Sequence, residues 1–147
     1  MNTERPPANQ GERGTAMLEM ALVLPFLLLL LFGIAELGLG LSRAQAVANA
    51  AREGARQASL YRGNCDAGEV QTRARNAVRD TASRLGIEPG RLSIQFDQVC
   101  VSQEAVRVRV QYPHEIRTLS ALAQLAGGSG LGPTLPLTSE AQMLNEM

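Results

Sequence analysis

The feature that most constrains this chain is an uncharged apolar run of 16 residues, from Met20 to Ala35. As an α-helix the run covers about 24 Å, which is short of the roughly 30 Å hydrocarbon core of a bilayer. Extended to residues 15–41, the same helix measures about 40 Å and can span the core. We therefore expect one transmembrane helix over residues 15–41, with Glu19 and Glu36 next to the two ends of the apolar run.

Two sequence features bear on whether this segment is a permanent membrane helix. Pro25 is expected to kink the helix, because proline removes a backbone hydrogen bond and clashes with the preceding turn. A cleavable secretory signal is an alternative interpretation, since Ala44-Gln45-Ala46 has the small-x-small cleavage pattern. However, the run is longer than a usual signal core and the residues before it are not clearly basic. These features favour a permanent membrane anchor.

The rest of the chain is the size of one modest domain. Of 147 residues, about 100 remain outside the membrane segment. Arg and Lys total 14, Asp and Glu total 14, and aromatic residues make up 3%. A balanced chain with few aromatic residues lacks the basic footprint of nucleic-acid-binding proteins. We therefore expect no nucleic-acid partner.

Catalysis and metal binding have few candidate residues. Cys65, Cys100 and His114 are spread along the chain, whereas zinc sites need three or four clustered ligands. A nucleophilic pair of Cys100 and His114 is formally possible, but such pairs mostly arise by chance. We expect no catalytic residue, no metal site and no cofactor.

The two cysteines favour a disulfide. Cys65 follows a helix-breaking Gly63-Asn64, and Cys100 lies between two strand-like segments. A Cys65–Cys100 bond would tie the helices to the sheet, and it requires an oxidising compartment outside the cytoplasm. Two buried free thiols and an intermolecular bond are the alternatives.

The arginine count bears on the orientation of the membrane helix. Taken alone, it slightly favours the C-terminal side of the helix inside the cell, which is opposite to the orientation that the disulfide requires.

Helical spacing of small apolar residues predicts two amphipathic helices after the run. The first covers residues 42–60 and continues the membrane helix; its apolar stripe is Ala44, Val47, Ala51, Ala55 and Ala58. The second covers residues 67–85 and ends at Gly86, with Val70, Ala74, Ala77, Val78, Thr81 and Leu85 on one face. Its arginines at 73, 75, 79 and 84 share the helix with Glu69 and Asp80, which indicates a solvated face.

Alternating apolar and polar residues then predict strands at 92–96 and 106–112, joined as a hairpin across residues 98–104. Pro113 is expected to end the second strand. A short helix over residues 115–126 and a Gly-rich loop to Pro133 follow, and residues 135–143 are expected to add an edge strand. Helices on one face of a small antiparallel sheet make an α+β fold.

A short motif stands at the N-terminal edge of the apolar run. Arg13-Gly14-Thr15 is followed by Glu19, inside the expected membrane helix. A carboxylate costs about 2.5–3.5 kcal/mol at the centre of a membrane helix and less near its end, so it suggests a function. The alternative is a helix-terminal acid that interacts with the helix dipole, with Thr15 as the cap.

This stretch resembles the processing site of type IV prepilins, where a membrane peptidase cuts after the glycine on the cytoplasmic face. The matching bond is Gly14–Thr15, and the matching acid is Glu19. Residues 14–38 also resemble the N-terminal segment of TadE-like pilus-assembly proteins. The resemblance lies in the acid before Ala-Leu-Val-Leu-Pro, the leucine run, and Phe-Gly-Ile followed by an acid; residues 50–56 add to it.

The resemblance implies a single-pass protein of the bacterial inner membrane. Residues 1–14 would be a cytoplasmic leader, residues 15–41 the membrane helix and residues 42–147 a periplasmic, pilin-like α+β domain. The function implied is that of a minor pseudopilin-like component for assembly of a tight-adherence (Flp-type) pilus. The implied partners are prepilin peptidase, other pilin-like subunits, the pilus secretion machinery and membrane lipid.

In this scheme, the Thr15 amine of a cleaved neighbour would pair with Glu19. Two alternatives remain at this point. The protein is an unprocessed inner-membrane scaffold of the same machinery, or it is a secreted or membrane-tethered enzyme.

Overall fold

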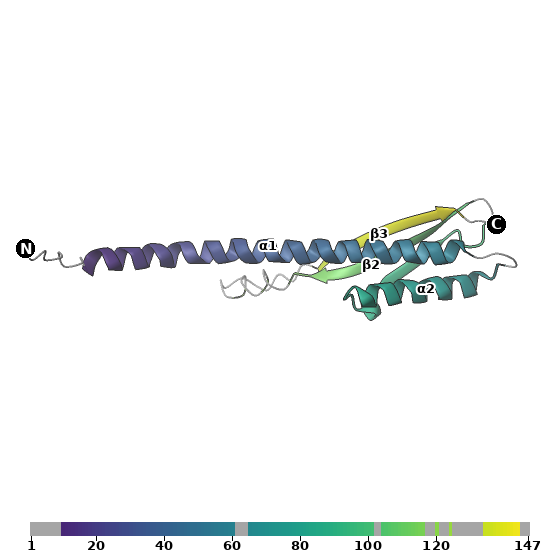
Figure 1. The fold of residues 1–147 in the computed structure, drawn as a ribbon, viewed down its shortest axis with the longest axis horizontal. Coiled ribbons are helices and arrows are strands. Elements are labelled where there is room, and N and C mark those ends of the chain that lie inside the picture. The colour runs from purple at the N-terminus through teal and green to yellow at the C-terminus, as the bar shows by residue number, and fades with distance from the viewer. Residues whose placement is uncertain are drawn as a thin grey trace, which may run out of the picture.

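The computed structural model describes residues 10–60, 65–101, 104–116, 120, 124 and 134–144. Two helices, α1 (Gln10–Ser59) and α2 (Ala67–Arg84), precede a short 3-10 helix, η1 (Pro89–Arg91). Strands β1 (Ser93–Asp97), β2 (Ala105–Glu115) and β3 (Thr134–Leu144) follow. Figure 1 shows α1 as a rod that extends far beyond the other elements, which pack along its C-terminal part. The expected α+β class is confirmed.

Helix α1 has two parts with different surroundings. From Gly14 to Ala35 its residues are exposed, except for the half-buried Gly33, and the helix is long and apolar enough to cross a membrane. The helix continues through Pro25 as one element, and the expected kink stays a prediction. The C-terminal part buries small residues, as its spacing predicted: Ala46, Val47, Ala50, Ala51, Ala55 and Ala58.

Helix α2 has clear start and stop signals. The Asp66 side chain caps its first turn by accepting a hydrogen bond from the Gly68 amide at 2.8 Å. At the other end Gly86 adopts φ +76°, and the Ile87 amide donates to the Ala82 carbonyl at 2.9 Å, which is a Schellman motif. Leu85 was expected on the apolar face, but it is 47% exposed because it is the C-cap residue, beyond the last helical turn.

The two helices and the sheet meet at Gly54 of α1. A Cβ atom there would overlap Cγ2 of Val78 on α2 and lie 3.4 Å from Cγ1 of Val108 on β2. Glycine therefore allows α1 to approach α2 and β2 closely. The buried face of α2 completes this core with Val70, Ala74, Val78 and Ala82.

The sheet is antiparallel in the order β1-β2-β3, so the third strand lies at an edge as expected. Strand β2 alternates strictly. Its inward side chains are buried against the helices: Val106, Val108, Val110, Tyr112 and His114. Its outward side chains include Arg109, which forms an ion pair with Glu140 of β3 at 2.8 Å. The helices therefore cover one face and leave a polar face outside.

The prediction that Pro113 ends the second strand is wrong. β2 continues to Glu115, and Pro113 lies opposite Pro136 of β3. Proline has no amide hydrogen, so it is tolerated where the ladder does not need one. Pairing of β2 with β1 ends at Gln111, so Pro113 also lies beyond that partner. The predicted start of the helix over residues 115–126 is also wrong, because Glu115 belongs to β2. Most other residues of that predicted helix, and the predicted loop to Pro133, lie outside the described residues.

Candidate functional site

The residues of the expected processing motif all lie on α1. Gly14, Thr15 and Glu19 are exposed along the helix. Because α1 begins at Gln10, Thr15 is not its cap and Glu19 lies beyond the first turn. The helix-dipole effect falls off within that turn, so it contributes little at Glu19 in the uncleaved chain. The processing and assembly roles of these residues stay predictions.

Cys65 and Cys100 form a disulfide next to the N-terminal end of α2. Cys65 directly precedes the cap of α2, and Cys100 follows β1, so the bond joins the helical layer to the sheet as expected. Both side chains pack against the core. A Cys100–His114 nucleophilic pair is excluded, because Cys100 is bonded and His114 lies near the opposite end of β2.

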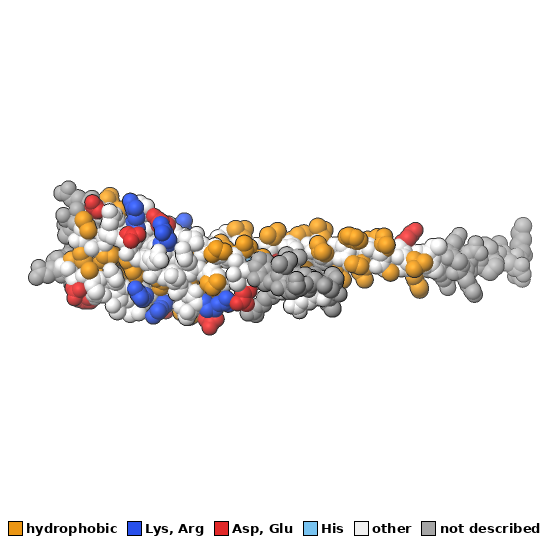
Figure 2. All heavy atoms as spheres, turned by 180° about the vertical axis from the view of Figure 1, so that it is seen from behind, with side chains coloured by type: hydrophobic (Ala, Val, Ile, Leu, Met, Phe, Trp, Pro, Cys, Tyr) orange, Lys and Arg blue, Asp and Glu red, His pale blue; other side chains and the backbone are white. Residues whose placement is uncertain are grey.

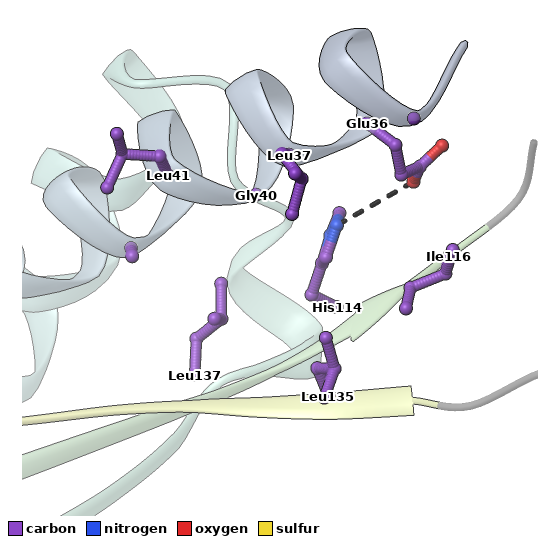
Figure 3. Close-up of a pocket in the computed structure, with 10 residues that line it drawn as sticks. Glu36, Leu37, Gly40, Leu41, His114, Ile116, Leu135 and Leu137 are labelled. Carbon is purple, nitrogen blue, oxygen red and sulfur yellow. Dashed lines mark ion pairs between the residues drawn. The ribbon is translucent and has the colours of Figure 1, made fainter. Parts of the chain in front are cut away.

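A buried polar cluster lies where the exposed helix enters the packed part. Glu36 of α1 is 8% exposed, and His114 of β2 is 2% exposed. The Nε2 atom of His114 lies 3.8 Å from Oε1 of Glu36, as Figure 3 shows. On the other side of the ring, Nη1 of Arg43 lies 2.7 Å from Nδ1 of His114. The imidazole of His114 thus lies between the carboxylate of Glu36 and the guanidinium group of Arg43, two residues that are two turns apart on α1.

The contact with Arg43 determines which nitrogen of His114 carries hydrogen. A guanidinium group only donates hydrogen bonds, so Nδ1 must accept. The hydrogen of the neutral ring is then on Nε2, which faces the carboxylate of Glu36. The cluster therefore holds the ring in one orientation and joins the end of β2 to α1.

Local sequence explains how the cluster forms. Glu36, Gly40 and Arg43 are spaced by four and three residues, so they share one face of α1. The ring of His114 lies against Gly40, where an added Cβ atom would meet Nε2 at 3.5 Å, an ordinary van der Waals distance. His114 reaches this face because it continues the inward alternation of β2 beyond Pro113. Sequence reasoning missed the cluster because it ended the strand at that proline.

A groove of about 350 Å³ opens beside the cluster. Glu36 and His114 lie in it, and the labelled apolar side chains of Figure 3 surround them from α1 and from the ends of β2 and β3. Its apolar lining consists of Gly33, Leu37, Gly40, Leu41, Ala44, Ile116, Leu135 and Leu137. The groove thus lies at the boundary between the exposed helix and the packed part.

The remaining surface separates by chemistry. Figure 2 shows hydrophobic side chains along the exposed rod of α1 and most charged side chains on the packed part. Two arginines of α2 form ion pairs along the helix, Arg73 with Glu69 and Arg84 with Asp80. Within the residues that the structure describes, no group of three or more His, Cys, Asp or Glu is arranged to hold a metal ion.

One comparison with known proteins gives a match. The family model described as TadE-like protein matches residues 14–56. Neither the curated proteins nor the solved structures give a match. The matched segment starts at Gly14, includes Glu19 and Glu36, and ends in the packed part of α1. The resemblance seen in the sequence is thereby confirmed: over residues 14–56 the chain is similar to TadE-like proteins, which are Tad pilus-related components.

Proposed function

We propose that this protein is a membrane-anchored, pilin-like component for assembly of a tight-adherence (Flp-type) pilus, with a structural and not an enzymatic role. The observation that carries the proposal is the TadE-like match, which covers both the exposed and the packed part of α1. A long N-terminal helix that packs on a small antiparallel sheet also suits a pilin-like plan.

In this proposal α1 crosses the bacterial inner membrane once. Residues 1–14 are cytoplasmic, and the domain formed by residues 42–147 is periplasmic. The Cys65–Cys100 disulfide supports this orientation, because disulfides persist in oxidising compartments. Among the residues that the structure describes, those of the domain first contact α1 around Glu36, so we assign residues 15–35 to the hydrocarbon core; as a helix they measure about 31 Å. Residues 36–41 then lie at the periplasmic interface.

The partners in this proposal are other pilin-like subunits, the pilus secretion machinery, prepilin peptidase and membrane lipid. The exposed apolar part of α1 would pack against helices of neighbouring subunits. After cleavage at Gly14–Thr15, the Thr15 amine of a neighbour would pair with Glu19. Because an unpaired charge in the membrane is costly, this pairing would favour one stagger between subunits.

A second candidate is an unprocessed inner-membrane scaffold of the same machinery. The observation that favours it is the start of α1 at Gln10, which places the Gly14–Thr15 bond inside a regular helix. A peptidase would have to unwind this turn to reach the bond.

The N-terminal residue of the protein separates the two candidates. Intact-mass measurement of protein extracted from the native membrane should find Thr15 at the N-terminus, and Gly14→Leu should retain the first 14 residues. A functional wild-type protein that begins at Met1 or Asn2 would instead identify the scaffold.

Pilus assembly tests the function itself. Glu19→Gln keeps the size of the side chain and removes its charge, so we expect normal insertion and cleavage but no pili by electron microscopy. Met17→Leu, at another exposed position of the same helix, is the control and should assemble normally. Normal piliation after deletion of the whole protein would contradict the proposed function.

A further inference from the structure

His114 is the one histidine of the chain, and its ring is almost completely buried. Its Nδ1 atom lies 2.7 Å from Nη1 of Arg43, and its Nε2 atom lies 3.8 Å from Oε1 of Glu36. Figure 3 shows the ring reaching from the end of β2 towards Glu36 on α1. Histidine is the side chain that ordinarily gains or loses a proton between pH 5 and 8. The protonation of this one ring therefore bears on both contacts.

The other elements around the ring offer no competing charge within the residues that the structure describes. Both charged groups with a described contact to the ring, Glu36 and Arg43, belong to α1. β3 places the apolar Leu135 opposite His114 in the ladder. On β2, Arg91 of η1 contacts both titratable neighbours: the carboxylate of Glu115 at 2.6 Å and the ring of Tyr112, 5.6 Å from its centroid. A change of charge on His114 thus acts mainly on the two contacts with α1.

The contact with Arg43 exists only while the ring of His114 is neutral. In that state Nδ1 accepts the hydrogen bond from the guanidinium group, and Nε2 carries the hydrogen. Uptake of a proton places a second hydrogen on Nδ1, and an imidazolium has no acceptor left. Two N–H donors would then face each other across 2.7 Å. Arg43 has to move away from the protonated ring.

The balance of charge favours the same movement. With Glu36 ionised and His114 neutral, the cluster carries one negative and one positive charge. A proton on the ring would make this buried cluster positive, which is costly unless one cation leaves. Arg43 can leave, because it is only half-buried and its long side chain can carry the guanidinium group into water. The imidazolium then remains as the cation beside Glu36.

We propose that His114 is a pH-dependent switch that exchanges the cation beside Glu36. Near neutral pH the ring is neutral and holds Arg43 against the end of β2. In mild acid the ring takes up a proton, stays beside Glu36 as an imidazolium and releases Arg43 to solvent. The contact between β2 and Glu36 persists in both states, whereas Arg43 is held in only one of them. The switch would operate whether or not the protein assembles a pilus.

The test is nitrogen-15 NMR of the full chain in detergent micelles between pH 8 and pH 5. Because the chain has one histidine, every imidazole signal belongs to His114. We expect hydrogen on Nε2 alone near pH 8 and on both ring nitrogens near pH 5. A guanidinium group held by a hydrogen bond rotates slowly and gives resolved N–H signals. The resolved signals of Arg43, identified by their loss in Arg43→Met, should disappear at the midpoint of the His114 transition.

Variants show whether the two contacts control this transition. Glu36→Gln removes the charge that stabilises the imidazolium, so the midpoint should fall by about 1 pH unit or more. Arg43→Met removes a like charge and the donor to the neutral ring, so the midpoint should rise by a similar amount. Arg52→Met is the matched control, because it removes the same charge from an exposed position about 14 Å farther along α1. It should leave the midpoint unchanged.

Four results would overturn the switch. A hydrogen on Nδ1 near pH 8 would contradict the contact with Arg43. A ring that keeps one hydrogen down to pH 5 would show that it does not titrate in mild acid. Resolved Arg43 signals that persist through the His114 transition would show that the cation is not released. Equal midpoints in Arg43→Met and Arg52→Met would show that Arg43 does not control the ring.

Discussion

At the scale of single residues, Gly54 is where close packing opposes helix propensity. Alanine is a better helix former than glycine by about 0.8–1 kcal/mol, but its Cβ atom would overlap Val78 of α2. Overpacking typically costs about 1–3 kcal/mol, so the overlap should outweigh the gain. We expect Gly54→Ala to lower the free energy of unfolding in detergent, measured by circular dichroism. Gly38→Ala, on an open face of the same helix, should not lower it.

Glu53 makes a pH-dependent contribution to the stability of the fold, also at the scale of a single residue. Hydrogen bonds from Arg56, at 2.7 and 2.9 Å, and then from Gln57 lower the pKa of Glu53 from 4.5 to about 2. Because the folded pKa lies below the unfolded value, this stabilisation is present above pH 4.5 and is lost as the pH falls towards 2. The pair is partly exposed, so its contribution is about 0.2–1 kcal/mol.

Glu53→Gln should therefore lower the melting temperature slightly at neutral pH and have no effect near pH 2. The measurement is thermal unfolding of both proteins in detergent across this pH range. A difference in melting temperature between the two proteins that stays constant from neutral pH down to pH 2 would contradict this role of the Glu53 carboxylate.

At the scale of elements, α1 is one helix whose two parts lie in different environments. Its exposed part consists mainly of large apolar residues such as Leu and Phe, and the buried face of its packed part mainly of alanines, with Val47 and Gly54. Large side chains suit contact with lipid, while small ones allow α2 and β2 to approach the helix axis closely. The Glu36–His114–Arg43 cluster marks the change between the two environments.

This cluster predicts how the end of the sheet is held against α1. His114→Ala removes a buried ring and its contacts with Arg43 and Glu36, for an expected loss of about 1–3 kcal/mol. Hydrogen exchange should become faster at residues 112, 114 and 115 of β2 and at the paired residues 137, 135 and 134 of β3. Exchange near Cys65 and Cys100, at the other end of the fold, should not change.

His114→Asn provides the conservative comparison. Its side-chain oxygen can accept the hydrogen bond from Arg43 in place of Nδ1. We expect it to restore part of the lost protection. Equal exchange in the alanine variant and the wild type would show that the cluster does not hold the sheet.

At the scale of the whole molecule, the disulfide reports both stability and orientation. It closes a loop of 35 residues, for which the chain-entropy model gives roughly 4 kcal/mol. That is a large share of the 5–15 kcal/mol typical of a domain. The double variant Cys65→Ser, Cys100→Ser should therefore melt at a clearly lower temperature than the wild type.

The same bond tests the periplasmic placement of the domain. Protein from native cells, denatured and alkylated without reduction, should carry no alkyl group, whereas reduced protein should carry two. Two alkylated thiols per chain without reduction would remove the bond and with it the main support for a periplasmic domain.

Local patterns by themselves determined most of the elements of this protein. The uncharged run predicts the exposed helix, the alanine spacing predicts the continuation of α1, and strict alternation predicts the three strands. The loop positions of Cys65 and Cys100 predicted their bond. These features are readable because each depends on neighbours along the chain: helical or extended periodicity, or a break between two periods.

Only the tertiary structure decided where the buried polar cluster lies. Glu36 and His114 are far apart in sequence, and neither has a local pattern that points to the other. The strand also passes through Pro113, which has no amide hydrogen and lies opposite Pro136 of β3, beyond the end of pairing with β1. Register between strands and the approach of β2 to α1 at Gly40 depend on the packing of the whole domain. Contacts of this long range are set by the shape of the core and not by the periodicity of any one segment.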